Sequence, residues 1–141
     1  MNTTATSEIL FVYGTLRKDV LHEMFHILAK YASFLGGATV RGCLYDLGTY
    51  PGMVLSDDPT KEVFGELYRV RRENWDEVIA VLDDYEGCGP KDAEPHEYNR
   101  SIVTAKTRDG LEQKVWAYLL ARPVAELPII PGGDYLAQRN G

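Results

Sequence analysis

Hydrophobic positions near the start of the chain follow two spacings, one typical of strands and one typical of helices. Residues 9–13 form a short apolar run that stops at Gly14, which predicts a buried strand ending in a tight turn. Apolar side chains then recur near helical spacing from Val20 to Tyr31. This second pattern predicts a helix with its apolar stripe on the core, in a segment that closes at Gly36-Gly37.

The pattern changes between residues 38 and 70. Residues 40–47 and 63–70 carry short alternating runs of apolar and polar side chains. Gly48, Pro51-Gly52 and residues 57–59 interrupt these runs with residues typical of turns. The segment therefore predicts two or three antiparallel strands.

A second helix is predicted directly after these strands. Its apolar positions follow the i, i+3, i+4, i+7 spacing of a helix face: Trp75, Val78, Ile79 and Leu82. Asn74 and Glu77 stand three residues apart, as in an N-terminal capping pair. Gly87 suits the left-handed position beyond a helix C-terminus, so the helix is expected to end there.

The rest of the chain favours strands and loops. Residues 88–97 are a loop by composition, and residues 98–107 and 113–120 flank Asp109-Gly110, a strong hairpin signal. Residues 123–141, rich in Pro and Gly, are expected to be irregular with a short helical turn. Strands outnumber helices and hairpin neighbours dominate, which predicts an α+β fold on a mostly antiparallel, strongly curved sheet.

The length and net charge of the chain limit the kinds of protein that it can be and the partners that it can bind. The chain has 141 residues, 45% of them hydrophobic, which fits one domain over residues 1–141. Its formal net charge of -6 opposes phosphate binding, so we expect a small-molecule partner, no nucleic acid and no membrane. No run of about 18 apolar residues is present, and Cys43 and Cys88 give no disulfide framework. These features predict a cytoplasmic protein and leave its oligomeric state open.

The turn after the first predicted strand is one candidate for a binding site. A strand that turns sharply at Gly14 leaves successive backbone N–H groups free to point at an anion or a carbonyl oxygen. Thr15 could add a hydroxyl donor, and Arg17 could add a positive charge for an anionic substrate group. The same residues also fit an ordinary strand end.

Acidic residues at the end of the second predicted helix are another candidate. Asp83, Asp84 and Glu86 fall where the helix dipole is negative, so the dipole and the like charges both raise the pKa of a further carboxylate. If Tyr85 and nearby apolar groups shield Glu86 from water, Glu86 suits general acid–base catalysis near neutral pH. A solvated acidic helix end fits the same pattern.

Histidines and tyrosines offer further possibilities. His22 and His26 form a literal H-E-x-x-H motif on the first predicted helix, the spacing of zinc peptidases. A catalytic zinc needs a third ligand, and the remaining histidine, His96, is in a predicted loop, so we predict no metal and keep a zinc hydrolase as an alternative. Tyr50 and Tyr118 suit the wall of a small pocket or, equally, the rim of a core.

Several of these segments together resemble the γ-glutamylcyclotransferase-like family, which includes γ-glutamylamine cyclotransferases. The matching stretches are FVYGTLR at 11–17, FLG at 34–36, GCLYDLGTYPG at 42–52, VFGELY at 63–68 and LDDYEG at 82–87, with Tyr98 and Arg100. They occur in the family's order and cover roughly residues 9–120. The segment after Leu16 departs from the family by lacking a glycine often found there.

The resemblance implies a fold, a reaction and a site. The implied fold is a small mixed, mostly antiparallel β-barrel with flanking helices. The implied reaction cyclises a γ-glutamyl amine or amide to 5-oxoproline and a free amine, with no cofactor. Glu86 would be the catalytic acid/base and Tyr13, Gly14, Thr15 and Leu16 the substrate loop. A binding module that holds a γ-glutamyl or carboxylate metabolite without turnover remains the alternative, since fold and function separate readily.

Overall fold

The computed structural model describes residues 8–14, 25–48 and 50–135. These residues form the following helices and strands: β1 (Ile9–Val12), α1 (Phe25–Tyr31), β2 (Ala32–Asp46), β3 (Pro51–Leu55), β4 (Glu62–Val70), α2 (Trp75–Glu86), β5 (Tyr98–Thr107) and β6 (Glu112–Leu120). Two 3-10 turns, η2 (Arg72–Asn74) and η3 (Pro131–Gly133), complete the described elements.

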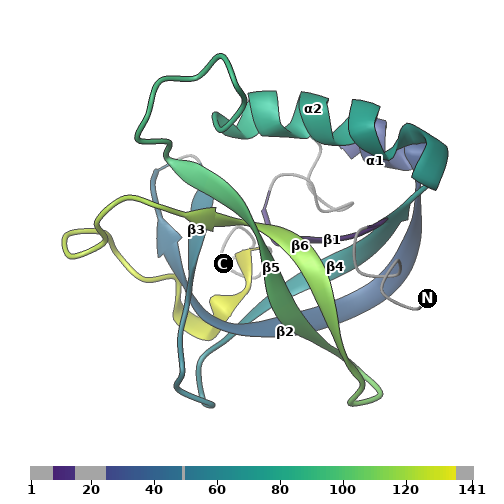
Figure 1. The fold of residues 1–141 in the computed structure, drawn as a ribbon. Helices are drawn as coiled ribbons and strands as arrows, with labels where there is room; N and C mark the ends of the chain where they lie inside the picture. Colours follow the sequence, from purple (N-terminus) through teal and green to yellow (C-terminus); the bar gives the residue numbers. More distant parts are fainter. Residues whose placement is uncertain (1–7, 15–24, 49, 136–141) are drawn as a thin grey trace.

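Five of these strands close into a barrel (Figure 1). The pairing order is β3-β2-β4-β1-β6-β5, and β5 pairs back onto β2. The β1–β6 pairing is parallel, and the other strand pairings are antiparallel. β3 extends the sheet beyond the ring as the partner of β2. The expected mixed, mostly antiparallel barrel is therefore confirmed.

β1 is buried on both of its faces, which explains its unbroken run of apolar residues. Ile9 and Phe11 belong to the core cluster that includes Leu44, Leu67 and Val115 of other barrel strands. The alternate residues of β1 belong to a second core cluster, which also contains side chains of both helices: Leu10 and Val12 with Leu28, Val78 and Leu82. β1 therefore joins the barrel core to the helical layer.

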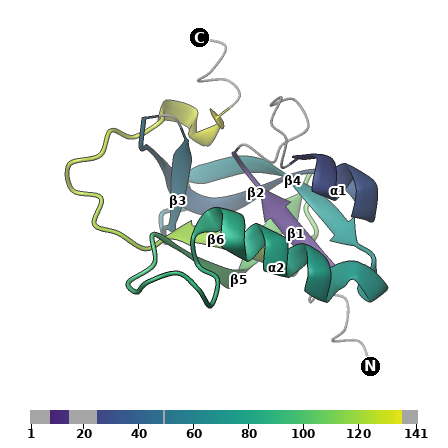
Figure 2. The same ribbon diagram turned by 90° about the horizontal axis from the view of Figure 1, so that it is seen from above.

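Both helices lie on the same side of the barrel, as Figures 1 and 2 show. α2 ends at Glu86, and the chain then runs through a loop into β5. The left-handed residue predicted at Gly87 is confirmed, with φ of 77°. The Gly87 and Cys88 amides donate to the carbonyls of Asp84 and Asp83, which stops the helix at this point. Within the described helices, none has the length and apolar character needed to cross a membrane.

The predicted end of the first helix is wrong. α1 ends at Tyr31, and β2 begins at the next residue, Ala32, which pairs with Val70 of β4. The ladder to β4 continues through the two glycines that were expected to close the helical segment. Gly36 instead follows a β-bulge after Phe34, where its φ of 123° suits a residue without a side chain. Residues 20–24, where the helix was predicted to begin, lie outside the described residues.

Two smaller predictions are also corrected. Pro51-Gly52, read as an interruption, opens β3, where a proline is tolerated as the first residue of a strand. The Asn74 side chain makes no capping hydrogen bond to α2, because Asn74 ends the preceding turn η2 and has helical backbone angles. The hairpin predicted around Asp109-Gly110 is confirmed as β5 and β6.

Candidate active site

A cavity of about 330 Å³ opens where β1 ends, next to the C-terminal end of α2. Its walls come from chain segments that are distant in sequence. They are Phe11 and Val12 of β1 with Tyr13 and Gly14 directly after it, Tyr50 and Pro51 at the start of β3, Tyr85, Glu86 and Gly87 at the end of α2, Glu97 and Tyr98 at the start of β5, and Tyr118 on β6.

The turn at Gly14 lies close against the start of β3. A Cβ atom at Gly14 would lie 3.0 Å from Cγ of Pro51, which is tighter than ordinary packing. The glycine therefore allows the end of β1 to approach β3 at the wall of the cavity.

Buried tyrosines fix the cavity wall through their hydroxyl groups. Tyr13 donates to the backbone carbonyl of Tyr118 at 2.7 Å and accepts from the amide of Met53 at 3.1 Å. Tyr98 donates to the carbonyl of Pro51 at 2.7 Å. Burial raises the pKa of Tyr13 and of Tyr98, so both hydroxyls stay protonated as donors. Their rings line the cavity while their hydroxyls hold neighbouring backbone in place.

Asp83 ties the end of α2 to the β5–β6 hairpin. Its carboxylate accepts two hydrogen bonds from Arg100, at 2.9 and 3.1 Å, and one from the Tyr118 hydroxyl at 2.7 Å. The Arg100 guanidinium also lies 4.9 Å from the centre of the Trp116 ring. Because Asp83 precedes Glu86 by about one helical turn, this network holds the segment that carries Glu86.

Glu86 is the partly buried acid of the cavity. Burial, and next the charges of Asp83 and Glu97, raise the pKa of Glu86 from 4.5 to about 7. A carboxyl group that exchanges its proton near neutral pH and is open to a cavity can act as a general acid and base.

A second acid, Glu97, lines the cavity from the start of β5. The Tyr50 hydroxyl lies 3.2 and 3.3 Å from its two oxygens, and Arg122 donates to Oε2 at 3.2 Å. The carboxylate is thus anchored at the cavity wall by a phenol and a guanidinium.

The amino-acid sequence matches one protein family over nearly the whole of this structure. The family model described as "Gamma-glutamyl cyclotransferase, AIG2-like" matches residues 10–137. The chain belongs to this family. All the cavity-lining residues fall within the matched range.

Relatives support the same assignment. The gamma-glutamylcyclotransferase family protein YtfP of Escherichia coli K12 is 33% identical over 128 residues, which cover 90% of this chain and 95% of YtfP. The solution structure of E. coli ytfP has a TM-score of 0.61 at 30% identity, covering 94% of this chain and 99% of that one. An AIG2-like protein from Mus musculus shares the fold, with a TM-score of 0.70 at 23% identity, over 91% of this chain and 87% of that one.

The γ-glutamyl cyclotransferase fold brings most of the predicted site residues together. Tyr13, Gly14, Tyr50, Tyr118 and Glu86 line the same cavity, although they come from four separate segments. The hydroxyls of Tyr13 and Tyr118 are engaged with protein groups, so these residues contribute chiefly ring surface. Thr15, Leu16 and Arg17 were also predicted for the site and lie outside the described residues.

Other residues of the site were missed by the sequence reading. The sequence pattern places Glu97 in a loop and indicates no role for it, and it indicates Asp83 only as a charge near Glu86. Arg100 was noted as part of a family pattern, but no spacing rule connects it with Asp83, 17 residues away. The one sequence signal for Glu97 was its place directly before Tyr98 at the start of a predicted strand.

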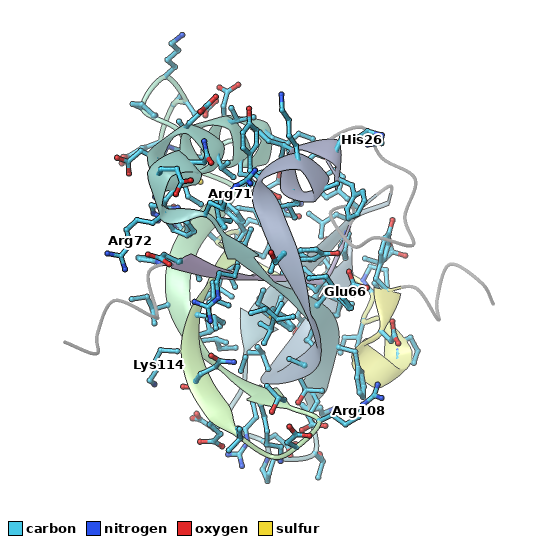
Figure 3. All side chains as sticks on the ribbon, turned by 90° about the vertical axis from the view of Figure 1, so that its right-hand side faces the viewer. His26, Glu66, Arg71, Arg72, Arg108 and Lys114 are labelled. Carbon is cyan, nitrogen blue, oxygen red and sulfur yellow. The ribbon has the colours of Figure 1, made fainter. Side chains whose placement is uncertain are left out.

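The zinc alternative gains no support from the described part of the chain. His26 is exposed on α1, as Figure 3 shows, and His22 lies outside the described residues. His96 lies 3.3 Å from the backbone carbonyl of Asp92 through Nε2. No group of three or more His, Cys, Asp or Glu side chains suited to a metal ion occurs among the described residues.

Proposed function

We propose that this protein is a cyclotransferase that cleaves a γ-glutamyl amine or amide and releases 5-oxoproline and the free amine. The observation that carries the proposal is Glu86, a carboxyl group with a pKa of about 7 in the cavity that Gly14 also lines. Membership of the γ-glutamyl cyclotransferase family supports the same reaction class.

The substrate supplies its own nucleophile in this reaction. The α-amine attacks the γ-carbonyl carbon, a C–N bond forms to close the five-membered ring, and the bond from that carbon to the departing nitrogen breaks. Holding the glutamyl chain in a folded shape supplies part of the rate enhancement, because the two reacting groups already belong to one molecule. The reaction is neither an oxidation nor a reduction.

Glu86 would move the protons. Its carboxylate removes one proton from the α-ammonium group, and the resulting carboxylic acid gives that proton to the departing nitrogen. The second proton, which the ring nitrogen loses as it becomes an amide, passes to the freed amine, so the amine departs as an ammonium ion and Glu86 ends as a carboxylate. With a pKa of about 7, both forms of Glu86 are populated near neutral pH, which suits a residue that must act first as base and then as acid. Backbone donors at the Gly14 turn would bind the α-carboxylate or the developing oxyanion.

The test is release of 5-oxoproline from γ-glutamyl amines, such as γ-glutamyl-ε-lysine, and from γ-glutamyl dipeptides. We expect Glu86→Gln to lower kcat by about 100-fold or more while circular dichroism shows a folded protein. Glu77→Gln, an exposed substitution on the first turn of α2, is the matched control and should keep full activity. Full activity in Glu86→Gln would remove Glu86 from the mechanism.

Binding without turnover would favour the other prediction, a non-catalytic module. In that case γ-glutamyl compounds would raise the melting temperature and no 5-oxoproline would form. A cytoplasmic location remains part of the proposal, since both cysteines are free thiols, as is usual in a reducing compartment.

A further inference from the structure

The charges that line the cavity are of one sign. Among the described lining residues, Glu86 and Glu97 are charged, and neither lysine nor arginine is present. The two acids come from different elements, Glu86 from the end of α2 and Glu97 from the start of β5. If Glu86 exchanges protons with the reacting amine, Glu97 remains available for another role.

The Glu97 carboxylate is held in position but retains hydrogen-bonding capacity. Its oxygens accept from the Tyr50 hydroxyl, and Oε2 also accepts from Arg122. Arg122 is outside the cavity lining, and its side chain is 47% exposed. A carboxylate offers about four acceptor positions, so a donor entering from the cavity can still bind Glu97.

Aromatic rings flank this carboxylate. The rings of Tyr50 and Tyr98 lie 6.3 Å apart, and both residues line the cavity with Glu97. The hydroxyls of both tyrosines are engaged with protein groups, so a ligand meets their faces and edges. Ring faces attract cations and pack against methylene groups. This side of the cavity therefore suits an alkyl chain that ends in a positive charge.

We propose that Glu97 determines specificity by binding a second, positively charged group on the leaving amine. The preferred substrates are then γ-glutamyl amides of diamines and other cationic amines. γ-Glutamyl peptides, whose leaving group ends in a carboxylate, are disfavoured by like charge. This inference rests on the proposed cyclotransferase function and adds the substrate class.

The test compares three γ-glutamyl amides that differ in the charge at the far end of the leaving amine. The leaving amines are 1,4-diaminobutane, which carries a cation, n-pentylamine, which is neutral and has the same number of heavy atoms, and 4-aminobutyrate, which carries an anion. We expect kcat/KM to fall in that order, by about fivefold or more at each step, as for a partly shielded charge pair. Equal values for the three substrates would overturn the inference and leave the cyclotransferase function intact.

Two variants test whether Glu97 causes the preference for a cationic leaving amine. In Glu97→Gln the ratio of kcat/KM for the cationic and neutral substrates should fall to about one. The ratio is the readout because removing the Glu97 charge also changes the proton affinity of Glu86, and that change affects both substrates alike. Glu94→Gln removes an exposed charge from the same loop outside the cavity lining and should keep the wild-type ratio. An unchanged ratio in Glu97→Gln would refute the role of Glu97.

A binding measurement keeps the two proposals separable. Calorimetry with the Glu86→Gln variant, in which Glu97 is the remaining acid of the described lining, should show tighter binding of the diaminobutane amide than of the pentylamine amide. If the wild-type protein cleaves neither these three compounds nor γ-glutamyl-ε-lysine and γ-glutamyl dipeptides, the cyclotransferase function fails, and this affinity ratio alone decides the role of Glu97. A ratio of one there would overturn it.

Discussion

Replacing Glu86 with glutamine removes one titrating group from the cavity and keeps nearly the same shape. Burial and the charges of Asp83 and Glu97 raise the pKa of Glu86 from 4.5 to about 7 in the folded protein. The unfolded chain returns Glu86 to its ordinary pKa. Between these two values the folded state binds the proton more tightly, so its contribution to stability is fully present below about pH 4.5 and is lost as the pH rises through about 7.

The size of this effect follows from the two pKa values. The difference between 4.5 and about 7 corresponds to about 3 kcal/mol of unfolding free energy over the whole range. About 2 kcal/mol of that falls between pH 5.5 and pH 8, where few other carboxylates titrate. Wild-type protein should therefore lose about 2 kcal/mol more than Glu86→Gln on going from pH 5.5 to pH 8.

The assay is urea unfolding at both pH values, followed by circular dichroism. Subtracting the free energy of Glu86→Gln from that of the wild type cancels the titration of the other groups. Glu77→Gln, at the exposed first turn of the same helix, is the control and should parallel the wild type. A difference between wild type and Glu86→Gln that is the same at both pH values would show that Glu86 titrates like a surface carboxylate.

Three further predictions concern residues that hold the site and the barrel in place. For each variant the measurement is the free energy of unfolding, determined by urea denaturation. Arg100→Met should cost about 2 kcal/mol because it leaves the Asp83 carboxylate without its cation; no loss would mean that the pair is dispensable. Tyr13→Phe should cost about 2 kcal/mol, since the buried amide of Met53 loses its acceptor, and wild-type stability would contradict this. Gly65→Ala should cost about 3 kcal/mol because its Cβ would lie 2.6 Å from the Phe11 ring, and tolerance would show that the barrel core can shift.

Local features were the part of the fold that could be read from the sequence. The apolar spacing of α2, the left-handed Gly87 and the Asp109-Gly110 hairpin depend on residues within a few positions of one another. Local signals failed where a distant strand competed with them. The two glycines after α1 resemble a helix end, but pairing with β4 extends β2 through them.

The candidate active site also has features that the local sequence predicts and features that only the tertiary structure decides. The sequence by itself determined that Glu86 stands at the acidic C-terminal end of a helix and that Gly14 ends a buried strand. Closure of the barrel decided that both residues line one cavity, with Glu97 beside them. The shift in the pKa of Glu86 is a tertiary effect, since its first cause is burial by side chains from other segments. Spacing along a chain encodes local geometry, whereas a cavity and its electrostatics arise only when segments far apart in sequence pack together.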